Sequence, residues 1–216
     1  MKRAMIKHLT SKGMTVDGVP IAIGIHVTFK INYRHMKLKY LLLAIFIGLL
    51  LNASAQKFIT KAGVIEIYSQ TPIYIFKGVN NQVGSILDAE NGEIVSSALI
   101  RSFKFEQALV EDRFNKNYLD PVKFPKSTFQ GKIMDYKKIN FSENGRHDVT
   151  IEGKLTINGV TNYIKERGVL TVNNGNVTAL AEFIVSLKAY KINVEKAYEQ
   201  DNVLLKIHFN YQPYSI

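Results

Sequence analysis

The chain has 216 residues, of which 46% are hydrophobic. This is enough to form the hydrophobic core of one domain but short for two. The formal net charge of +10 suggests a nucleic-acid partner, but the basic excess is concentrated near the N-terminus. Residues 1–55 hold eight of the 28 basic and one of the 18 acidic side chains, which leaves 20 basic and 17 acidic in residues 56–216. A surface with nearly equal numbers of basic and acidic side chains lacks the concentrated positive field that phosphate binding needs. We therefore expect no nucleic-acid partner.

An export signal is predicted at residues 36–55. A short cationic start is followed by an apolar run of eleven residues, 41–51, and then by small side chains at Ala53 and Ala55, so cleavage is expected before Gln56. An apolar run of eleven is far below the roughly 20 residues that span a bilayer, which argues against a membrane anchor. We therefore expect an exported protein, either periplasmic or secreted.

Residues 1–35 precede a methionine that is well placed to begin a signal peptide. We interpret this stretch as a start-site misassignment, with a genuine long leader as the alternative. The sequence has no cysteine, which excludes disulfides, thiolate metal sites, thiol catalysis and a lipid-modified cysteine. After signal cleavage, we expect no stable membrane anchor.

From residue 56 onward the dominant pattern is alternation of apolar and polar side chains with a period of two, which is typical of half-buried antiparallel strands. Asn158-Gly159 is a strong hairpin signal, and a further turn is predicted at 173–176. Turns are also expected at Asn80-Asn81 and at 90–92. Strands are predicted at 63–68, 71–79, 83–88, 94–103, 127–134, 147–157, 177–187 and 203–211, with another strand-like run after Asn158-Gly159.

One segment departs from the period of two. Phe105 and Leu109 have helical spacing, Ser102 is a plausible N-cap, and Asp120 precedes a proline that would end a helix. We predict one inserted amphipathic helix at about 104–119. About eight strands can close into a barrel with room for side chains or a small ligand. The fold class expected for residues 56–216 is thus all-β, a single antiparallel β-barrel domain that the helix crosses or covers.

Residues able to do catalysis are scarce. The predicted mature chain has two histidines, His147 and His208, which we expect on the polar sides of separate strands. No nucleophile elbow, phosphate loop, dinucleotide fingerprint or HExxH motif occurs. We therefore predict a protein that is not an enzyme, with no cofactor and no metal site.

Aromatic residues gather in the predicted helix and the strand after it, which suggests a lid over an apolar cavity. Small residues at interior positions, Gly131, Gly153, Ala179 and Ala181, are expected to leave space for a ligand. The residues predicted to contact it are Phe105, Phe114, Tyr118, Phe129, Ile133, Ala181, Phe183, Val185, Leu205 and Ile207.

Four segments together resemble the YceI-like family, in order and spacing, over residues 57–212. Lys123 to Gly131 resembles its F-P-x-x-x-F segment, and Gly153 to Thr161 is similar to its G-x-L-T-I-x-G-V-T hairpin. Phe103 to Leu119 is similar to its helix, and Ser186 to Ile192 to its late strand end. Arg113 and Asn158 depart from the pattern, since each replaces a histidine common in the family.

The resemblance implies an extended lipocalin-like barrel, export, and in some members an enclosed polyisoprenoid or similar lipid. An apolar lipid-like ligand is therefore the expected partner, and its burial would gain about 0.8 kcal/mol per CH₂ group. The alternative is an interaction or structural module whose barrel is filled by its own side chains. The resemblance implies no catalytic residues, and a homodimer is left open.

Overall fold

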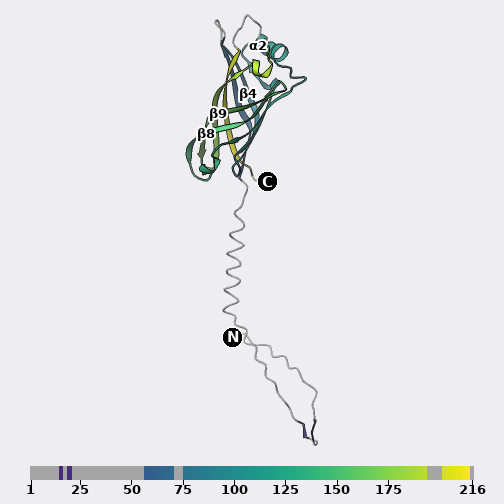
Figure 1. Cartoon of the computed structure of the whole chain (residues 1–216), viewed down its shortest axis with the longest axis vertical. Helices are drawn as coiled ribbons and strands as arrows, with labels where there is room; N and C mark the ends of the chain where they lie inside the picture. Colours follow the sequence, from purple (N-terminus) through teal and green to yellow (C-terminus); the bar gives the residue numbers. More distant parts are fainter. Residues whose placement is uncertain (1–14, 17–18, 21–55, 71–74, 194–200, 215–216) are drawn as a thin grey trace. The chain divides into compact units, whose positions relative to one another are not determined.

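The computed structural model describes residues 15–16, 19–20, 56–70, 75–193 and 201–214 (Figure 1). The chain divides into two units, Met1–Asn52 and Ala53–Ile216. In the first unit, strands β1 (Thr15–Val16) and β2 (Val19–Pro20) pair antiparallel. The predicted signal peptide lies outside the described residues.

The second unit contains a closed barrel of eight antiparallel strands, which confirms the predicted fold class. Their order around the barrel is β3, β11, β10, β9, β8, β7, β5 and β4, and the pairing of β3 with β4 closes the ring. A short ninth strand, β6 (Lys104–Phe105), adds to β4. The barrel strands are β3 (Lys57–Gln70), β4 (Ile75–Asp88), β5 (Glu93–Leu99), β7 (Lys126–Ile133), β8 (Gly145–Ile157), β9 (Val160–Asn173), β10 (Asn176–Ser186) and β11 (Asn202–Tyr214).

Two of the predicted turns form tight hairpins with the expected backbone. Asn158 and Gly159 join β8 to β9 with φ values of 51° and 74°, and Asn174 and Gly175 join β9 to β10 with 49° and 77°. Positive φ at both central residues matches the twist of the flanking strands, and asparagine and glycine tolerate it. The aromatic ring of Phe124, from the F-P segment, lies against Gly159 where a side chain would otherwise project.

The turn predicted at Asn80-Asn81 was wrong, because β4 runs through it as one strand. The register between β3 and β4 shifts near Asn80, as in a β-bulge. The Asn80 side chain is fully buried, where Nδ2 donates to the Leu99 carbonyl at 2.9 Å and Oδ1 accepts from the Gln82 N–H at 2.9 Å. The Asn80 side chain thus hydrogen-bonds two backbone groups inside the fold, whereas an Asn-Asn pair is typical of a surface turn.

The inserted helix is shorter than predicted. Lys104 and Phe105 form β6, and α2 (Ala108–Arg113) starts only after them, continuing as a single π-helical stretch, η2 (Phe114–Tyr118). The ring of Phe105 packs over Gly78 of β4, which holds this part of the chain extended. Leu109, expected on the buried helix face, is 61% exposed. Lys104 Nζ lies 2.7 Å from Glu111 Oε1 and ties the helix to β6.

Three 3₁₀ turns complete the described structure: η1 (Ile100–Ser102), η3 (Tyr136–Lys138) and η4 (Lys188–Tyr190). The predicted strand at 94–103 accordingly ends at Leu99 and passes into η1. Helix α2 lies at one end of the barrel (Figure 1). None of the described helices is long and apolar enough to cross a membrane.

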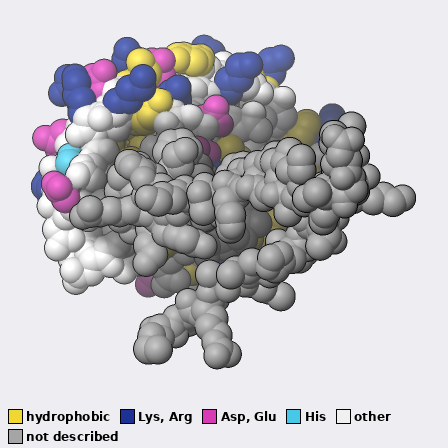
Figure 2. Space-filling view, turned by 90° about the horizontal axis from the view of Figure 1, so that it is seen from below, with side chains coloured by type: hydrophobic (Ala, Val, Ile, Leu, Met, Phe, Trp, Pro, Cys, Tyr) yellow, Lys and Arg dark blue, Asp and Glu magenta, His cyan; other side chains and the backbone are white. Residues whose placement is uncertain are grey.

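Buried apolar side chains form two clusters inside the barrel. The first includes Phe58, Leu170 and Tyr211, and the second includes Leu155, Phe183 and Leu205. Alternation on the strands supplies most members of both, since every second side chain points inward. Residues outside the strands, such as Phe141 and Tyr190, complete the clusters. On the outside, Lys or Arg and Asp or Glu side chains are interspersed along the described edge of the face shown in Figure 2.

Candidate functional site

The barrel interior contains an apolar cavity of about 110 Å³. Ligand pockets usually measure about 300–1,000 Å³, so the described conformation is mostly filled by its own side chains. Residues from both core clusters line the cavity. They include Ile65, Val83, Ile94, Ser96, Phe129, Ile151, Leu155, Ile164, Glu166, Leu170, Ala179, Ala181, Phe183, Leu205, Ile207, Phe209 and Tyr211.

Several inward-facing side chains around this cavity are only partly buried. Phe129 and Ile207 contact both core clusters, and Ile151, Ala179 and Ala181 each contact one. Accessible area on inward positions of a closed barrel marks incomplete packing, because well-packed interiors leave few voids. The middle of the barrel is therefore the part of the core with room to rearrange.

The glycines predicted to leave space do not do so. Gly131 and Gly153 are directly paired across β7 and β8, and a Cβ on Gly153 would meet the Gly131 Cα and the Gln130 carbonyl. The ring of Phe129 lies over Gly131 and fills the volume above the pair. Ala179 and Ala181, by contrast, do line the cavity. The glycine pair therefore allows close strand contact and leaves the space to the two alanines.

Polar groups close one part of the cavity wall. Ser85 Oγ lies 2.7 Å from both Ser96 Oγ and the Tyr211 hydroxyl, and it donates to the Val95 carbonyl at 3.2 Å. Tyr211 is 1% exposed, and burial raises the pKa of its phenol. The network stays neutral, so it can place hydroxyl groups beside an apolar ligand without adding a charge.

One carboxyl group lies on the inner side of the wall. Alternation on β9 points Ile164, Glu166 and Gly168 inward, and Glu166 pairs across the sheet with the inward-facing Ile151. Glu166 is half-buried, lines the cavity, and burial raises its pKa. An acid on an otherwise apolar face is costly unless it has a use, which makes Glu166 a candidate contact for a polar group of a ligand.

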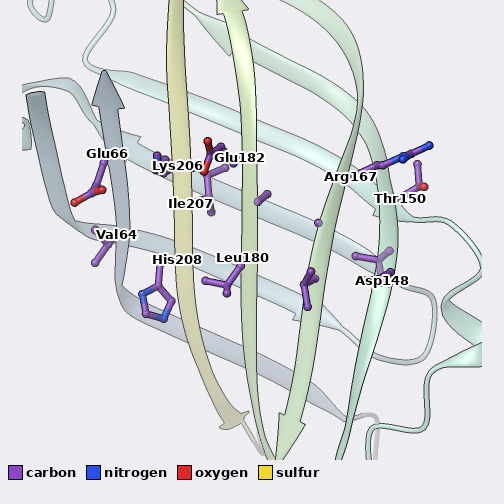
Figure 3. A pocket seen from close by; sticks show the side chains of 14 residues that line it. Val64, Glu66, Asp148, Thr150, Arg167, Leu180, Glu182, Lys206, Ile207 and His208 are labelled. Atoms are coloured by element: carbon purple, nitrogen blue, oxygen red, sulfur yellow. Dashed lines mark ion pairs between the residues drawn. The ribbon is translucent and has the colours of Figure 1, made fainter. Parts of the chain in front are cut away.

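A groove of about 850 Å³ runs over the outside of the barrel across β3, β11, β10, β9 and β8 (Figure 3). Its charges are mixed, with Lys206 Nζ 3.2 Å from Glu182 Oε2, and with Arg167 and Asp148 farther along. Glu66, at the β3 side, has a lowered pKa because Lys77 donates a hydrogen bond to its carboxylate.

The predicted ligand residues separate into two groups. Phe129, Ala181, Phe183, Leu205 and Ile207 line the cavity. Ile133 is fully buried in the first cluster and Val185 is buried in the second, and neither lines the cavity.

Phe105 of β6 and the helix residues Phe114 and Tyr118 do not line the cavity either. The Phe114 ring packs 4.9 Å from the Phe105 ring and 5.6 Å from the Phe103 ring, and Tyr118 contacts the second cluster. Whether any of the predicted residues contacts a ligand stays a prediction.

Two residues were missed or misplaced by the sequence reading. Glu166 was missed, although its place among the inward apolar residues of β9 could have revealed it. His147 was placed on the polar side of its strand, which was wrong because it shares the inward face with Val149. His147 is half-buried and its Nε2 is buried without a hydrogen-bond partner, whereas His208 is exposed in the groove as expected. The described residues contain no cluster of His, Asp or Glu able to hold a metal ion.

The comparisons with known proteins agree with this fold. The YceI-like domain model matches residues 69–211. A polyisoprenoid binding domain from Saccharophagus degradans, implicated in plant cell wall breakdown, has a similar fold with a TM-score of 0.63, 10% identity and coverage of 74% of this chain and 99% of that chain.

Two other solved structures are also similar. BcnA from Burkholderia cenocepacia gives a TM-score of 0.54 at 16% identity, covering 69% of this chain and 95% of its own. A YceI protein from Campylobacter jejuni gives a TM-score of 0.52 at 14% identity, and the match covers 64% of this chain and 85% of that chain. No curated protein sequence matches closely enough to add a relative. Because the family model spans well over half of the chain, this protein belongs to the YceI-like domain family.

Proposed function

We propose that this protein is an exported binding protein that encloses the hydrocarbon chain of a polyisoprenoid or similar lipid in its barrel. The observation that carries the proposal is the apolar cavity in the middle of the barrel, bordered by partly buried side chains. The fold similarity to a polyisoprenoid binding domain supports the same class of ligand. We propose that the protein binds the lipid and does not catalyse a reaction on it.

A cavity of about 110 Å³ cannot hold a long chain without change. Binding therefore requires side chains in the middle of the barrel to move, and the partly buried Phe129 is the largest of those that contact both core clusters there. Rotation of such a side chain needs no change in the strands. The ligand would replace contacts among these side chains with contacts along its own length.

The second candidate is an interaction module with a side-chain-filled barrel. The small volume of the cavity favours it. In that case no apolar ligand would bind at stoichiometric amounts, and the outer surface would carry the function.

A ligand-length series separates the two. Binding of geraniol, farnesol and geranylgeraniol to residues 56–216 should be saturable at one molecule per chain, with affinity rising at each added isoprene unit. The physical reason is that each buried CH₂ contributes about 0.8 kcal/mol. Isothermal titration or displacement of a fluorescent apolar dye measures it. Absence of binding, or affinity independent of length, would support the filled barrel and overturn the lipid-binding proposal.

Export is proposed from the signal-like residues 36–55. The intact mass of the protein recovered outside the cytoplasm should correspond to a chain that begins at Gln56. A recovered chain that still contains the apolar run 41–51 would contradict this.

A further inference from the structure

Strands β9 and β10 are paired along only part of their length. Their register begins beside the Asn174-Gly175 turn and ends at the pair Gly168 and Ala181. Beyond that pair, residues 160–167 of β9 remain paired with β8, and residues 182–186 of β10 remain paired with β11. The two strands diverge from the lower toward the upper part of Figure 3. Each unpaired stretch is thus held from one side only.

The far end of this opening is bounded by η4. Asn162 Nδ2, on β9, donates a hydrogen bond to the carbonyl of Ala189, at 2.9 Å. The opening in the barrel wall is therefore a window, which we define as residues 163–167 of β9 and 182–186 of β10. It is closed below by the pair Gly168 and Ala181 and above by the Asn162 contact.

The outer groove and the inner cavity meet beside this window. Four residues line both of them: Val169, Leu180, Ala181 and Ile207. Ala181 belongs to the last register pair of β9 and β10, and Val169 is next to its partner, Gly168. At the lower edge of the window, the same residues therefore separate the outer groove from the inner cavity.

The outer rim of the window is apolar. Tyr163 on β9 is 64% exposed, Ile184 on β10 is 65% exposed, and Leu180 just below is 43% exposed. Large apolar side chains gathered around one opening on an exterior face mark a site of contact with an apolar partner. Their position beside the cavity indicates what that partner is: the hydrocarbon chain that the cavity would receive.

We propose that this window is a lateral port through which the lipid enters the barrel, hydrocarbon first, with Glu166 at its threshold favouring an uncharged hydroxyl headgroup over a phosphate. The proposal rests on the proposed lipid-binding function. It adds the route into the barrel and the class of headgroup.

The route follows from the pairing. Parting two strands that share no hydrogen bonds costs no ladder bonds, whereas opening any fully paired seam does. Entry at the α2 end would instead require separating the packed rings of Phe105 and Phe114, whose centroids are 4.9 Å apart. The window is thus the less costly way into the cavity.

The headgroup preference follows from Glu166. Its carboxyl lies on the inward face of the β9 side of the window, beside the cavity. A carboxylate accepts a hydrogen bond from a hydroxyl group and repels a phosphate. The basic side chains that line the groove, Arg167 and Lys206, belong to outward positions, and Lys206 is already paired with Glu182.

A cross-link across the window tests the route. Lys165→Cys and Ile184→Cys place two exposed thiols on opposite sides of it, in a chain that has no cysteine of its own. Joining them with a short bis-maleimide should slow the association of geranylgeraniol by about tenfold or more, because the strands can no longer part. The matched control is Thr171→Cys with Thr178→Cys, on the same strands where they are already paired.

The control cross-link should leave the association rate within about twofold of the unlinked protein. Equal rates with the window cross-linked would overturn the port while leaving lipid binding intact. If the unlinked protein itself binds no geranylgeraniol, the proposed function fails and the port fails with it. Reduced, unlinked double-cysteine proteins report whether the substitutions alone disturb the fold.

Glu166→Gln tests the headgroup preference at mildly alkaline pH, where a carboxyl with a raised pKa is ionised. Affinity for geranylgeranyl phosphate should rise about tenfold, and affinity for geranylgeraniol should change less than about twofold. The control Glu93→Gln removes an exposed, outward carboxylate of β5, away from the window, and should change neither. A wild-type protein that binds the phosphate as tightly as Glu166→Gln does would overturn the preference.

Discussion

Replacing Gly153 by alanine is expected to lower the free energy of unfolding by on the order of 3 kcal/mol, the high end for overpacking. The added Cβ would meet the Cα of Gly131 and the carbonyl of Gln130, both backbone atoms of the paired strand β7. Backbone cannot rotate away as a side chain can, so β7 and β8 would have to separate. Chemical denaturation measures the effect.

Gly84→Ala is the matched control, since Gly84 lies within β4 and a Cβ there meets no atom within 4 Å. It should leave stability unchanged or raise it by about 0.5 kcal/mol through the unfolded state. Equal effects at Gly84 and Gly153 would contradict the close contact between the paired glycines.

Replacing Ala181 by phenylalanine is expected to abolish binding of geranylgeraniol while the barrel still folds. Ala181 lines the cavity of about 110 Å³, and an aromatic ring placed there would occupy the space a lipid chain needs. The neighbouring cavity limits the overpacking cost to about 1–3 kcal/mol. Binding and thermal melting are measured on the same samples.

Two further variants separate the possible causes. Thr178→Phe adds the same ring on an outward position of β10, outside both the cavity and the groove, and should bind normally. Ala179→Phe fills the cavity from a position that does not line the groove, and should also abolish binding. An Ala181→Phe protein that folds and still binds the lipid would show that the chain lies elsewhere.

The barrel could be predicted from the sequence because its signals are local. Alternation placed Val177, Phe183 and Leu205 inside, and the Asn-Gly pair at 158–159 forms the expected hairpin. The turn predicted at Asn80 was wrong because an asparagine in a turn and a buried asparagine that bonds backbone groups cannot be told apart by residue type. The predicted helix was too long because Phe105 packs over Gly78 of β4. This contact joins residues far apart in the sequence, so the local pattern could not show it.

The site was harder to predict for a related reason. Cavity volume depends on which side chain fills which gap, and the Phe129 ring covers Gly131 although both were expected to help form the binding space. The point where β9 leaves β10 has no marker in either strand, since the alternation continues through Gly168 and Ala181. Such features follow from strand register around the whole barrel rather than from one segment.

A lipid chain inside the barrel would contact the side chains that line the cavity. Intermolecular nuclear Overhauser effects between geranylgeraniol and protein with labelled alanine methyl groups detect such contacts. Ala179 and Ala181 line the cavity, whereas Ala98 lies across the barrel on β5, and Ala108 begins α2 outside it. We expect contacts from the lipid to Ala179, Ala181 and Ala98 and none to Ala108. Contacts to Ala108 alone, or to no alanine while the lipid is bound, would contradict it.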